Sequence, residues 1–178
     1  LFDAIAEVSK SHLQLLNPAY LSQIVWAFAK AEHATPSLFD AMADVSLSRV
    51  QDFDPQDIVK TVWAFAKAGH ASPMQFDALA EVALFRLNDF TPIQFGGTLW
   101  AFAKAAHASP ALFEAIAEVA TFRLKDFEPQ SLVNTVWAFA TARHASSAVF
   151  DAVAKAVTAR MKDFNSQNIA NTVWAFAK

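Results

Sequence analysis

The sequence predicts an all-α fold, a right-handed α-solenoid of about five helical hairpins with a repeat of 37 residues. The first observation is the even spacing of the five tryptophans, which lie 37 residues apart at Trp26, Trp63, Trp100, Trp137 and Trp174. The second is that phenylalanines keep the same spacing in columns, meaning equivalent positions of successive repeats, that begin at Phe2 and Phe28. The third is the scarcity of turn formers for an all-β fold, because only 3 Gly occur and all 7 Pro fall in two further columns.

Each repeat is predicted to contain two helices. The first helix is clearest over residues 109–125, where Ser109 suits the N-cap, Pro110 suits the first helical position, and apolar residues recur at i, i+3 and i+4. The second helix is clearest over residues 54–69, where Asp54 is a capping residue and Gly69 suits the C′ position. The second helix then has about 14 residues and a length of about 21 Å.

We expect one continuous repeat array over residues 1–178. Its repeats should cover approximately residues 1–34, 35–71, 72–108, 109–145 and 146–178. The chain begins with Leu1 rather than Met, without a signal or transit pattern, so we expect a fragment of a longer protein. The apolar content of 54% is explained by helices that have neighbours on two or three sides. Membrane insertion is not expected, because no apolar run approaches the roughly 18 residues of a membrane span.

The composition argues against an enzyme, a cofactor site and a metal site. The absence of Cys excludes thiolate ligands and cysteine nucleophiles. The acids, serines and histidines recur with the repeat, so no single catalytic constellation stands out. The histidine column supplies one residue per repeat and no local HxxxH pair, at His33, His70, His107 and His144. We expect these histidines to pack in loops or to cap the carbonyl groups of the second helices.

The second helices share the motif Pro-Gln-x-Ile/Leu-x-Asn-Thr-Val-Trp-Ala-Phe-Ala-Lys-Ala, which is clearest over residues 129–140 and 167–178. This motif resembles the octotricopeptide repeat, a helical hairpin found in RNA-binding proteins of chloroplasts and mitochondria. The resemblance covers every repeat, although the period is slightly shorter than the usual one and no RAP-type C-terminal domain is present. It implies sequence-specific binding of single-stranded RNA, a role in organellar RNA stability, processing or translation, and protein partners in an organellar ribonucleoprotein.

Two variable columns and one basic column are the candidate RNA contacts. On a helical wheel, Leu21, Val25 and Phe28 bury one side of the second helix, and the opposite side carries the columns of Ala19, Gln23 and Lys30, flanked by Tyr20. The candidates for reading bases are the Tyr20 column (Tyr20, Asp57, Gln94, Ser131, Asn168) and the Gln23 column (Gln23, Lys60, Gly97, Asn134, Asn171). The candidates for contacting phosphates belong to the Lys30 column, in which Thr141 replaces one lysine, and are Lys30, Lys67, Lys104 and Lys178.

Each of these columns also has an ordinary structural explanation. Polar variation on an exposed helix face arises by drift, and a lysine near a helix C-terminus is favoured by the helix dipole alone. Gly96 and Gly97 should cost about 1 kcal/mol each relative to Ala within a helix. They either admit a ligand close to the backbone or mark a degenerate repeat.

Charge is predicted to be segregated between the two kinds of helix. The first helices carry acids on one face, expected to be the outer convex surface, at Asp3, Glu7, Asp40, Asp44, Asp77, Glu81, Glu114, Glu118 and Asp151. The second helices and their trailing turns carry an excess of Lys and Arg, which predicts a mildly basic inner groove although the net charge is −3. The arginine column (Arg49, Arg86, Arg123, Arg160) is expected to pair with Asp52, Asp89, Asp126 and Asp163.

Two functions from different classes remain open at this stage. The first is a sequence-specific RNA-binding solenoid in which each repeat contacts one nucleotide. The alternative is a protein-interaction or scaffold solenoid, for example within an organellar ribosome or another assembly.

Overall fold

The computed structural model describes residues 1–178, which are 81% helical and contain no strand. Its ten α-helices are α1 (Phe2–His12), α2 (Pro18–Lys30), α3 (Pro36–Ser48), α4 (Pro55–Ala68), α5 (Pro73–Phe85), α6 (Pro92–Lys104), α7 (Pro110–Arg123), α8 (Pro129–Ala142), α9 (Ser147–Ala159) and α10 (Ser166–Ala177). Short 3-10 turns follow the odd-numbered helices at η1 (Leu13–Leu15), η2 (Val50–Asp52), η3 (Leu87–Asp89), η4 (Leu124–Asp126) and η5 (Met161–Asp163). None of the helices combines the length and the apolar character that crossing a membrane requires.

The prediction of two helices per repeat is confirmed. We call the odd-numbered helices the A helices and the even-numbered helices the B helices. In α4, Asp54 Oδ1 accepts a hydrogen bond from the backbone N–H of Asp57, and Gly69 ends the helix with a φ of 67°. The expected length of 14 residues is also confirmed for α4. Ser109 precedes α7 as predicted, but its side chain makes no capping hydrogen bond.

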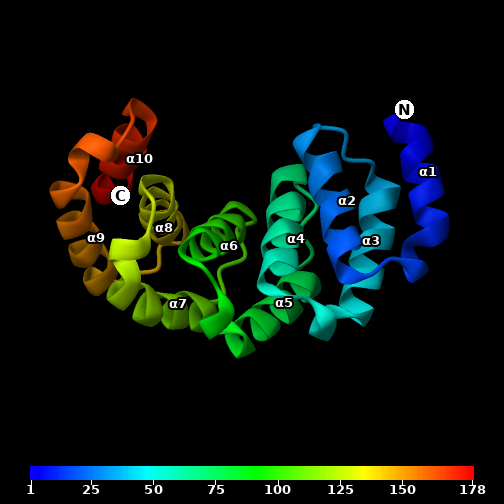
Figure 1. The fold of residues 1–178 in the computed structure, drawn as a ribbon, viewed down its shortest axis with the longest axis horizontal. Helices are drawn as coiled ribbons and strands as arrows, with labels where there is room; N and C mark the ends of the chain where they lie inside the picture. Colours follow the sequence, from blue (N-terminus) through cyan, green and yellow to red (C-terminus); the bar gives the residue numbers. More distant parts are fainter. The chain divides into compact units, whose positions relative to one another are not determined.

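The chain forms two compact units, residues Leu1–Arg86 and Leu87–Lys178. In the first unit α2 packs against α4, and the A helices α1, α3 and α5 pack against one another in sequence. In the second unit α8 lies between α6 and α10, while α7 packs against α9 (Figure 1). Within each unit, the B helices therefore form one row and the A helices form another. The extension of this pattern into one array over the whole chain stays a prediction.

Each hairpin has an aromatic core in which an A-helix phenylalanine meets a B-helix phenylalanine edge to face. The ring centroids are 5.1 Å apart in the Phe39–Phe65 pair and 5.1 Å apart in the Phe113–Phe139 pair. The same geometry recurs in the first and last hairpins, at 5.3 Å and 5.2 Å. The core phenylalanines Phe39, Phe65, Phe113 and Phe139 are fully buried. The 37-residue repeat of the sequence is thus a repeat of one packing unit.

The histidine column packs beside these phenylalanine pairs. The His33 ring lies 5.2 Å from the Phe2 ring, and His33 Nε2 is 2.8 Å from Asp3 Oδ1. His70 Nε2 is likewise 2.7 Å from Asp40 Oδ1. The predicted loop packing is confirmed, while the capping is done by the histidine backbone, for example where the N–H of His33 donates to the carbonyl of Phe28. No cluster of three or more His, Cys, Asp or Glu in the structure could hold a metal ion.

The arginine column joins each hairpin to the one before it. Arg123 Nη1 donates a hydrogen bond of 3.1 Å to the carbonyl oxygen of Phe90, and Arg160 Nη1 donates one of 2.7 Å to that of Phe127. Arg49 makes the equivalent bond to Leu16. The predicted pairing with aspartate is confirmed for Arg160, whose Nε lies 3.4 Å from Asp163, and for Arg49, at 3.9 Å from Asp52. The arginines therefore stabilise the contact between successive hairpins.

Candidate nucleic-acid interface

The B helices carry a stripe of tryptophan, lysine and amide side chains. Residues 23, 26 and 30 of α2 lie on one helix face because successive steps of three and four residues return to the same side. The same three positions of α4, α6, α8 and α10 follow at intervals of 37 residues. We call these positions the Trp stripe and describe it separately in the two units.

In the first unit, the Trp stripe is built by α2 and α4. The rings of Trp26 and Trp63 are 6.2 Å apart at an angle of 42°, and both side chains are half-buried. Lys60 Nζ donates a hydrogen bond of 2.8 Å to Gln23 Oε1. The Lys30 ammonium lies 4.8 Å from the centre of the Trp26 ring, at a distance suited to a cation–π contact. Amide, ring and ammonium groups thus follow one another along α2.

In the second unit, three tryptophans stack in series. Trp100 and Trp137 are 6.3 Å apart, and Trp137 and Trp174 are 6.2 Å apart, with interplanar angles of 30° and 26°. Trp174 is 41% exposed, and the Lys178 ammonium lies 5.7 Å from its ring. The stacked rings form a partly exposed aromatic surface along α6, α8 and α10.

An amide network lies next to this aromatic surface. Gln130 Nε2 donates a hydrogen bond of 2.8 Å to Asn134 Oδ1, and Asn168 Nδ2 donates one of 2.9 Å to Gln130 Oε1. Asn134 and Asn171, both of the Gln23 column, are half-buried. They therefore retain access to solvent beside the tryptophans, as the helical wheel predicts.

The face carrying the Trp stripe is free of exposed carboxylates. No Asp or Glu occurs in α2, α6, α8 or α10. The one acid of α4, Asp57, is 5% exposed. By contrast, all the acids predicted on the A helices are exposed, from Asp3 through Asp151. The predicted segregation of charge between the two kinds of helix is therefore confirmed within each unit.

The Tyr20 column does not line the open face that the sequence suggests. Tyr20 is 61% exposed, but Asp57, Ser131 and Asn168 are only 4–5% exposed. These positions are the third residues of their helices, and in α4 and α10 the side chain also accepts a hydrogen bond from the N-cap N–H. Gln94 makes the same capping box in α6 and is half-buried. The placement of Asp57, Ser131 and Asn168 on an accessible reading face is therefore wrong.

The burial of this column comes from the preceding B helix. Ser22 Oγ of α2 donates a hydrogen bond of 2.8 Å to Asp57 Oδ1 of α4. Burial raises the pKa of Asp57 above its usual value, against the opposing effect of the hydrogen bond from Ser22. Tyr20 escapes this environment because no B helix precedes α2 in the chain.

In the second unit, Gly96 occupies the position equivalent to Ser22. A Cβ atom on Gly96 would lie 3.1 Å from the carbonyl oxygen of Ser131 and 3.2 Å from its Cα. Gly96 is buried, so it admits the backbone of α8 rather than a ligand. This corrects the placement of Gly96 on a ligand-facing surface. Gly97, the next residue, is half-buried within the Trp stripe.

The lysine column lies at the surface throughout. Lys30, Lys67, Lys104 and Lys178 are exposed, and Thr141 is half-buried. Lys67 Nζ lies 3.2 Å from Glu32 Oε1 in an exposed ion pair. The structure thus brings the Gln23 and Lys30 columns together on one face and separates the Tyr20 column from them.

The tryptophan column is the part of this surface that the sequence argument assigns to core packing alone. Its spacing contains the necessary signal, because Trp26 lies three residues after Gln23 and four before Lys30. A residue at that spacing must share their face. Large aromatic rings are nevertheless more often core residues, and their partial exposure follows only from the packing of successive B helices.

The fold and this surface define an all-helical repeat protein with an aromatic, carboxylate-free binding face. The family model of the RNA-editing substrate-binding complex 6 protein matches residues 1–125. Since this match covers more than half of the 178 residues, the chain belongs to that family. A search of curated proteins finds no match to the chain.

Proposed function

We propose that the chain is a binding module for single-stranded RNA and contacts it through the Trp stripe. The observation that carries the proposal is the series of stacked, partly exposed tryptophans flanked by lysines on helices without exposed acids. Aromatic rings offer stacking surfaces to unpaired bases, and lysines contact phosphates. Membership of the RNA-editing substrate-binding complex 6 protein family supports a role in RNA editing assemblies.

The finer parts of the proposal concern the form of the module. We propose a right-handed α-solenoid of the octotricopeptide type, with one nucleotide per repeat and sequence selectivity from the Gln23 column. Its role is binding without catalysis. RNA-editing complexes of this kind are mitochondrial, so we place the chain in that organelle; the family gives no support for the chloroplast.

A randomised single-stranded RNA pool tests this function directly. We expect selective binding that weakens as salt rises, because phosphate contacts release counterions. Exchanging Asn134 for Lys and Asn171 for Gln, the residues that Lys60 and Gln23 supply in other repeats, should move the selected sequence. Absence of binding at low salt would exclude the function, and unchanged selection in both variants would exclude the Gln23 column as a reader.

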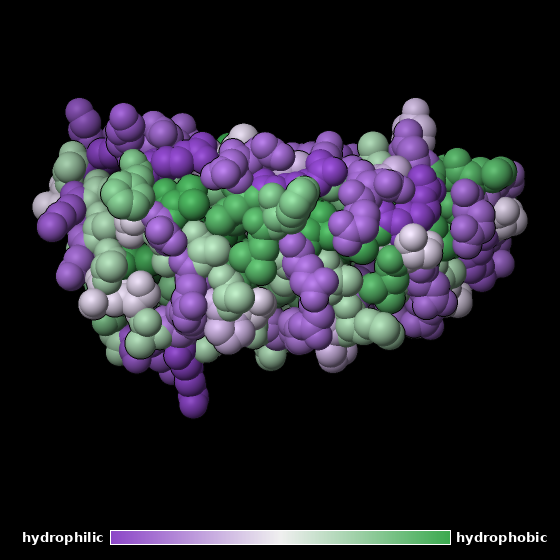
Figure 2. All heavy atoms as spheres, turned by 90° about the horizontal axis from the view of Figure 1, so that it is seen from below, coloured by the Kyte–Doolittle hydropathy of each residue, from purple (hydrophilic) through white to green (hydrophobic).

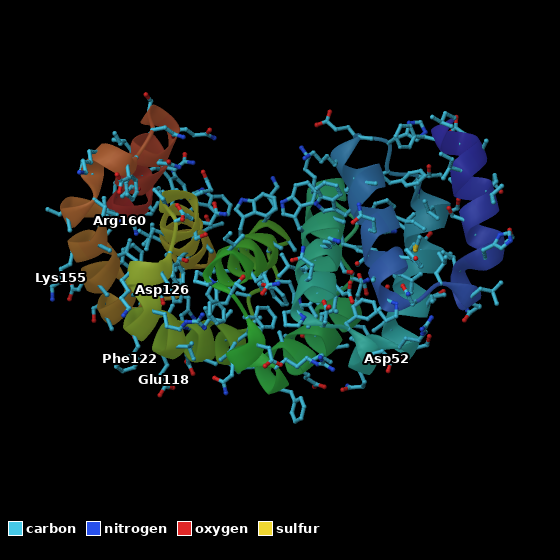
Figure 3. All side chains as sticks on the ribbon, viewed as in Figure 1. Asp52, Glu118, Phe122, Asp126, Lys155 and Arg160 are labelled. Carbon is cyan, nitrogen blue, oxygen red and sulfur yellow. The ribbon has the colours of Figure 1, made fainter.

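A protein-scaffold role is the second candidate, and exposed phenylalanines on the A helices favour it. Phe85 of α5 is 90% exposed and Phe122 of α7 is 82% exposed. Figure 2, which views the molecule from the side of α5 and α7, shows apolar side chains at the surface between hydrophilic ones. Phe122 and Glu118 point away from α7 (Figure 3). If this role holds, Phe122→Ser, which copies Ser48 of the second repeat, should abolish binding of a partner protein without changing RNA affinity.

A further inference from the structure

The C-terminal ends of neighbouring B helices enclose a hollow in the second unit. Between α8 and α10 the hollow has a volume of about 730 Å³ and is lined by Arg143, Lys178, Thr141 and Trp174, among others. A smaller hollow of about 220 Å³ between α6 and α8 is lined by Ala106 and other residues. Ala106 is equivalent to Arg143 by the 37-residue period, and Thr141 is equivalent to Lys178. The two hollows are therefore the same feature of the repeat with different side chains.

Two variable residues decide the charge of this feature. One is the residue that ends each B helix with a positive φ, at Glu32, Gly69, Ala106 and Arg143. The other is the Lys30-column residue of the following helix. Where the first residue is Glu32, the second is Lys67, and the two form an ion pair of 3.2 Å. Where the first residue is Arg143, the second is Lys178, so two cations line one hollow.

The surroundings of Arg143 and Lys178 provide no carboxylate to balance them. None of the residues that line the larger hollow is Asp or Glu, and His144 adds a further nitrogen donor. The dipole of α8 favours one cation near its C-terminus. The last carbonyls of α8 are already occupied, since the N–H of Arg143 donates to Ala140 and that of His144 to Phe139. Two cations and a hydroxyl facing one open space match the acceptors of a phosphate group.

We propose that this hollow, which we call the Arg143 notch, binds a phosphate group of single-stranded RNA. Arg143 and Lys178 supply the cationic donors. The exposed ring of Trp174 lies in the same hollow and gives the adjoining base a stacking surface. This inference rests on the proposed RNA-binding function and adds to it a particular phosphate contact, present at one repeat and neutralised at another.

Charge exchange between the two repeats tests the proposal. Arg143→Glu reproduces the pairing of Glu32 with Lys67 and should weaken binding of a fluorescein-labelled single-stranded RNA about tenfold, as expected for loss of one charge-assisted contact. Glu32→Arg should strengthen binding by opening a second cationic pair. Lys155→Glu is the matched control, because it makes the same change of charge on an exposed residue that points away from α9 (Figure 3). Circular dichroism verifies that each variant folds.

The outcomes separate the notch from the general function. If wild-type chain binds RNA and Arg143→Glu has no more effect than Lys155→Glu, the notch is excluded while the RNA-binding function stands. If wild-type chain fails to bind RNA, titration with inorganic pyrophosphate gives an independent answer. Saturable shifts of the backbone NMR signals of residues 141–145 would support a phosphate site, and their absence would exclude it. RNA with and without a 5′-phosphate distinguishes a terminal phosphate from an internal phosphodiester.

Discussion

Gln75 is a buried polar residue in an apolar column. Its side chain is fully buried and neither its amide oxygen nor its amide nitrogen has a hydrogen-bond partner. The equivalent residues of other repeats are Leu38 and Leu112, both fully buried. We predict that Gln75→Leu raises the free energy of unfolding by about 1 to 3 kcal/mol, because it removes an unpaired amide from the core. Urea denaturation measures this change.

The control for Gln75 is the reverse substitution in the same column. Leu112→Gln should lower the free energy of unfolding by at least about 1 kcal/mol. If Gln75→Leu were destabilising instead, the Gln75 amide would have a role that its burial does not reveal.

Asp57 gives stability a pH dependence of unusual sign. Because burial raises its pKa, the folded state holds the Asp57 proton more tightly than the unfolded state, whose pKa is about 3.9. Stability contributed by the neutral form is therefore lost as pH rises above that value. We predict that the stability of Asp57→Asn relative to wild type increases from pH 3 to pH 7 in urea denaturation. Asn168 shows that the fold accepts Asn at this position.

Asp3→Asn should show the opposite trend. The hydrogen bond with His33 lowers the pKa of Asp3, so its contribution is present above the unfolded-state pKa and is lost as pH falls. Asp3→Asn should therefore lose stability relative to wild type as pH rises through that range. Parallel pH trends in the two variants would contradict the assignment of either group.

Single residues were predictable from the sequence where their role depends on their own helix. Asp54 and Gly69 were assigned correctly because capping is local. Asp57 was assigned wrongly because its burial depends on Ser22, which is 35 residues away. The choice of Phe90 and Phe127 carbonyls by the arginine column also depends on the neighbouring hairpin. A helical wheel does not contain that information.

At the scale of elements, the distance between α6 and α8 depends on Gly96. Ala at this position would improve helix propensity by about 1 kcal/mol, but its Cβ would lie 3.1 Å from the Ser131 carbonyl oxygen, a backbone atom within a packed helix. Since overpacking typically costs about 1 to 3 kcal/mol, we predict that Gly96→Ala lowers the free energy of unfolding. The same substitution should change the near-ultraviolet circular dichroism of the Trp100–Trp137 pair by separating the two helices.

Gly69→Ala separates packing from backbone conformation. Gly69 has a φ of 67° and no atom within 4 Å of the position of an added Cβ. Its substitution should therefore cost stability through the backbone alone and leave the tryptophan signal unchanged. A stability gain in Gly96→Ala would show that Gly96 does not limit the approach of α6 and α8.

The helices themselves were predictable because their periodicity and caps repeat several times. The short 3-10 turns after the A helices were not, since they form where Asp52, Asp126 and Asp163 lead into an extended residue before the next N-cap. The Trp stripe is an intermediate case. Its spacing is in the sequence, but the partial exposure of its rings depends on how far successive B helices overlap.

At the scale of the whole molecule, charge is organised by helix type rather than by total. The net charge of −3 suggests weak affinity for nucleic acid. However, the exposed acids lie on the A helices and the turns, and the exposed side of the B helices carries lysine without acid. A local basic face can bind RNA within an acidic protein, because charges beyond about 10 Å are screened at physiological salt.

This arrangement predicts how RNA affinity depends on salt. If five cations of the Trp stripe and its notches contact phosphates, the logarithm of the association constant should fall with the logarithm of salt concentration with a slope of about −3.5, since each contact contributes about −0.7 for a single strand. Lys104 is an exposed member of the stripe on α6. Lys104→Ala should reduce the magnitude of the slope by about 0.7, whereas Lys155→Ala on α9 should leave it unchanged. Fluorescence anisotropy at several salt concentrations measures both slopes. Equal slopes for the two variants would show that RNA binds elsewhere, because a phosphate contact cannot be removed without releasing fewer counterions.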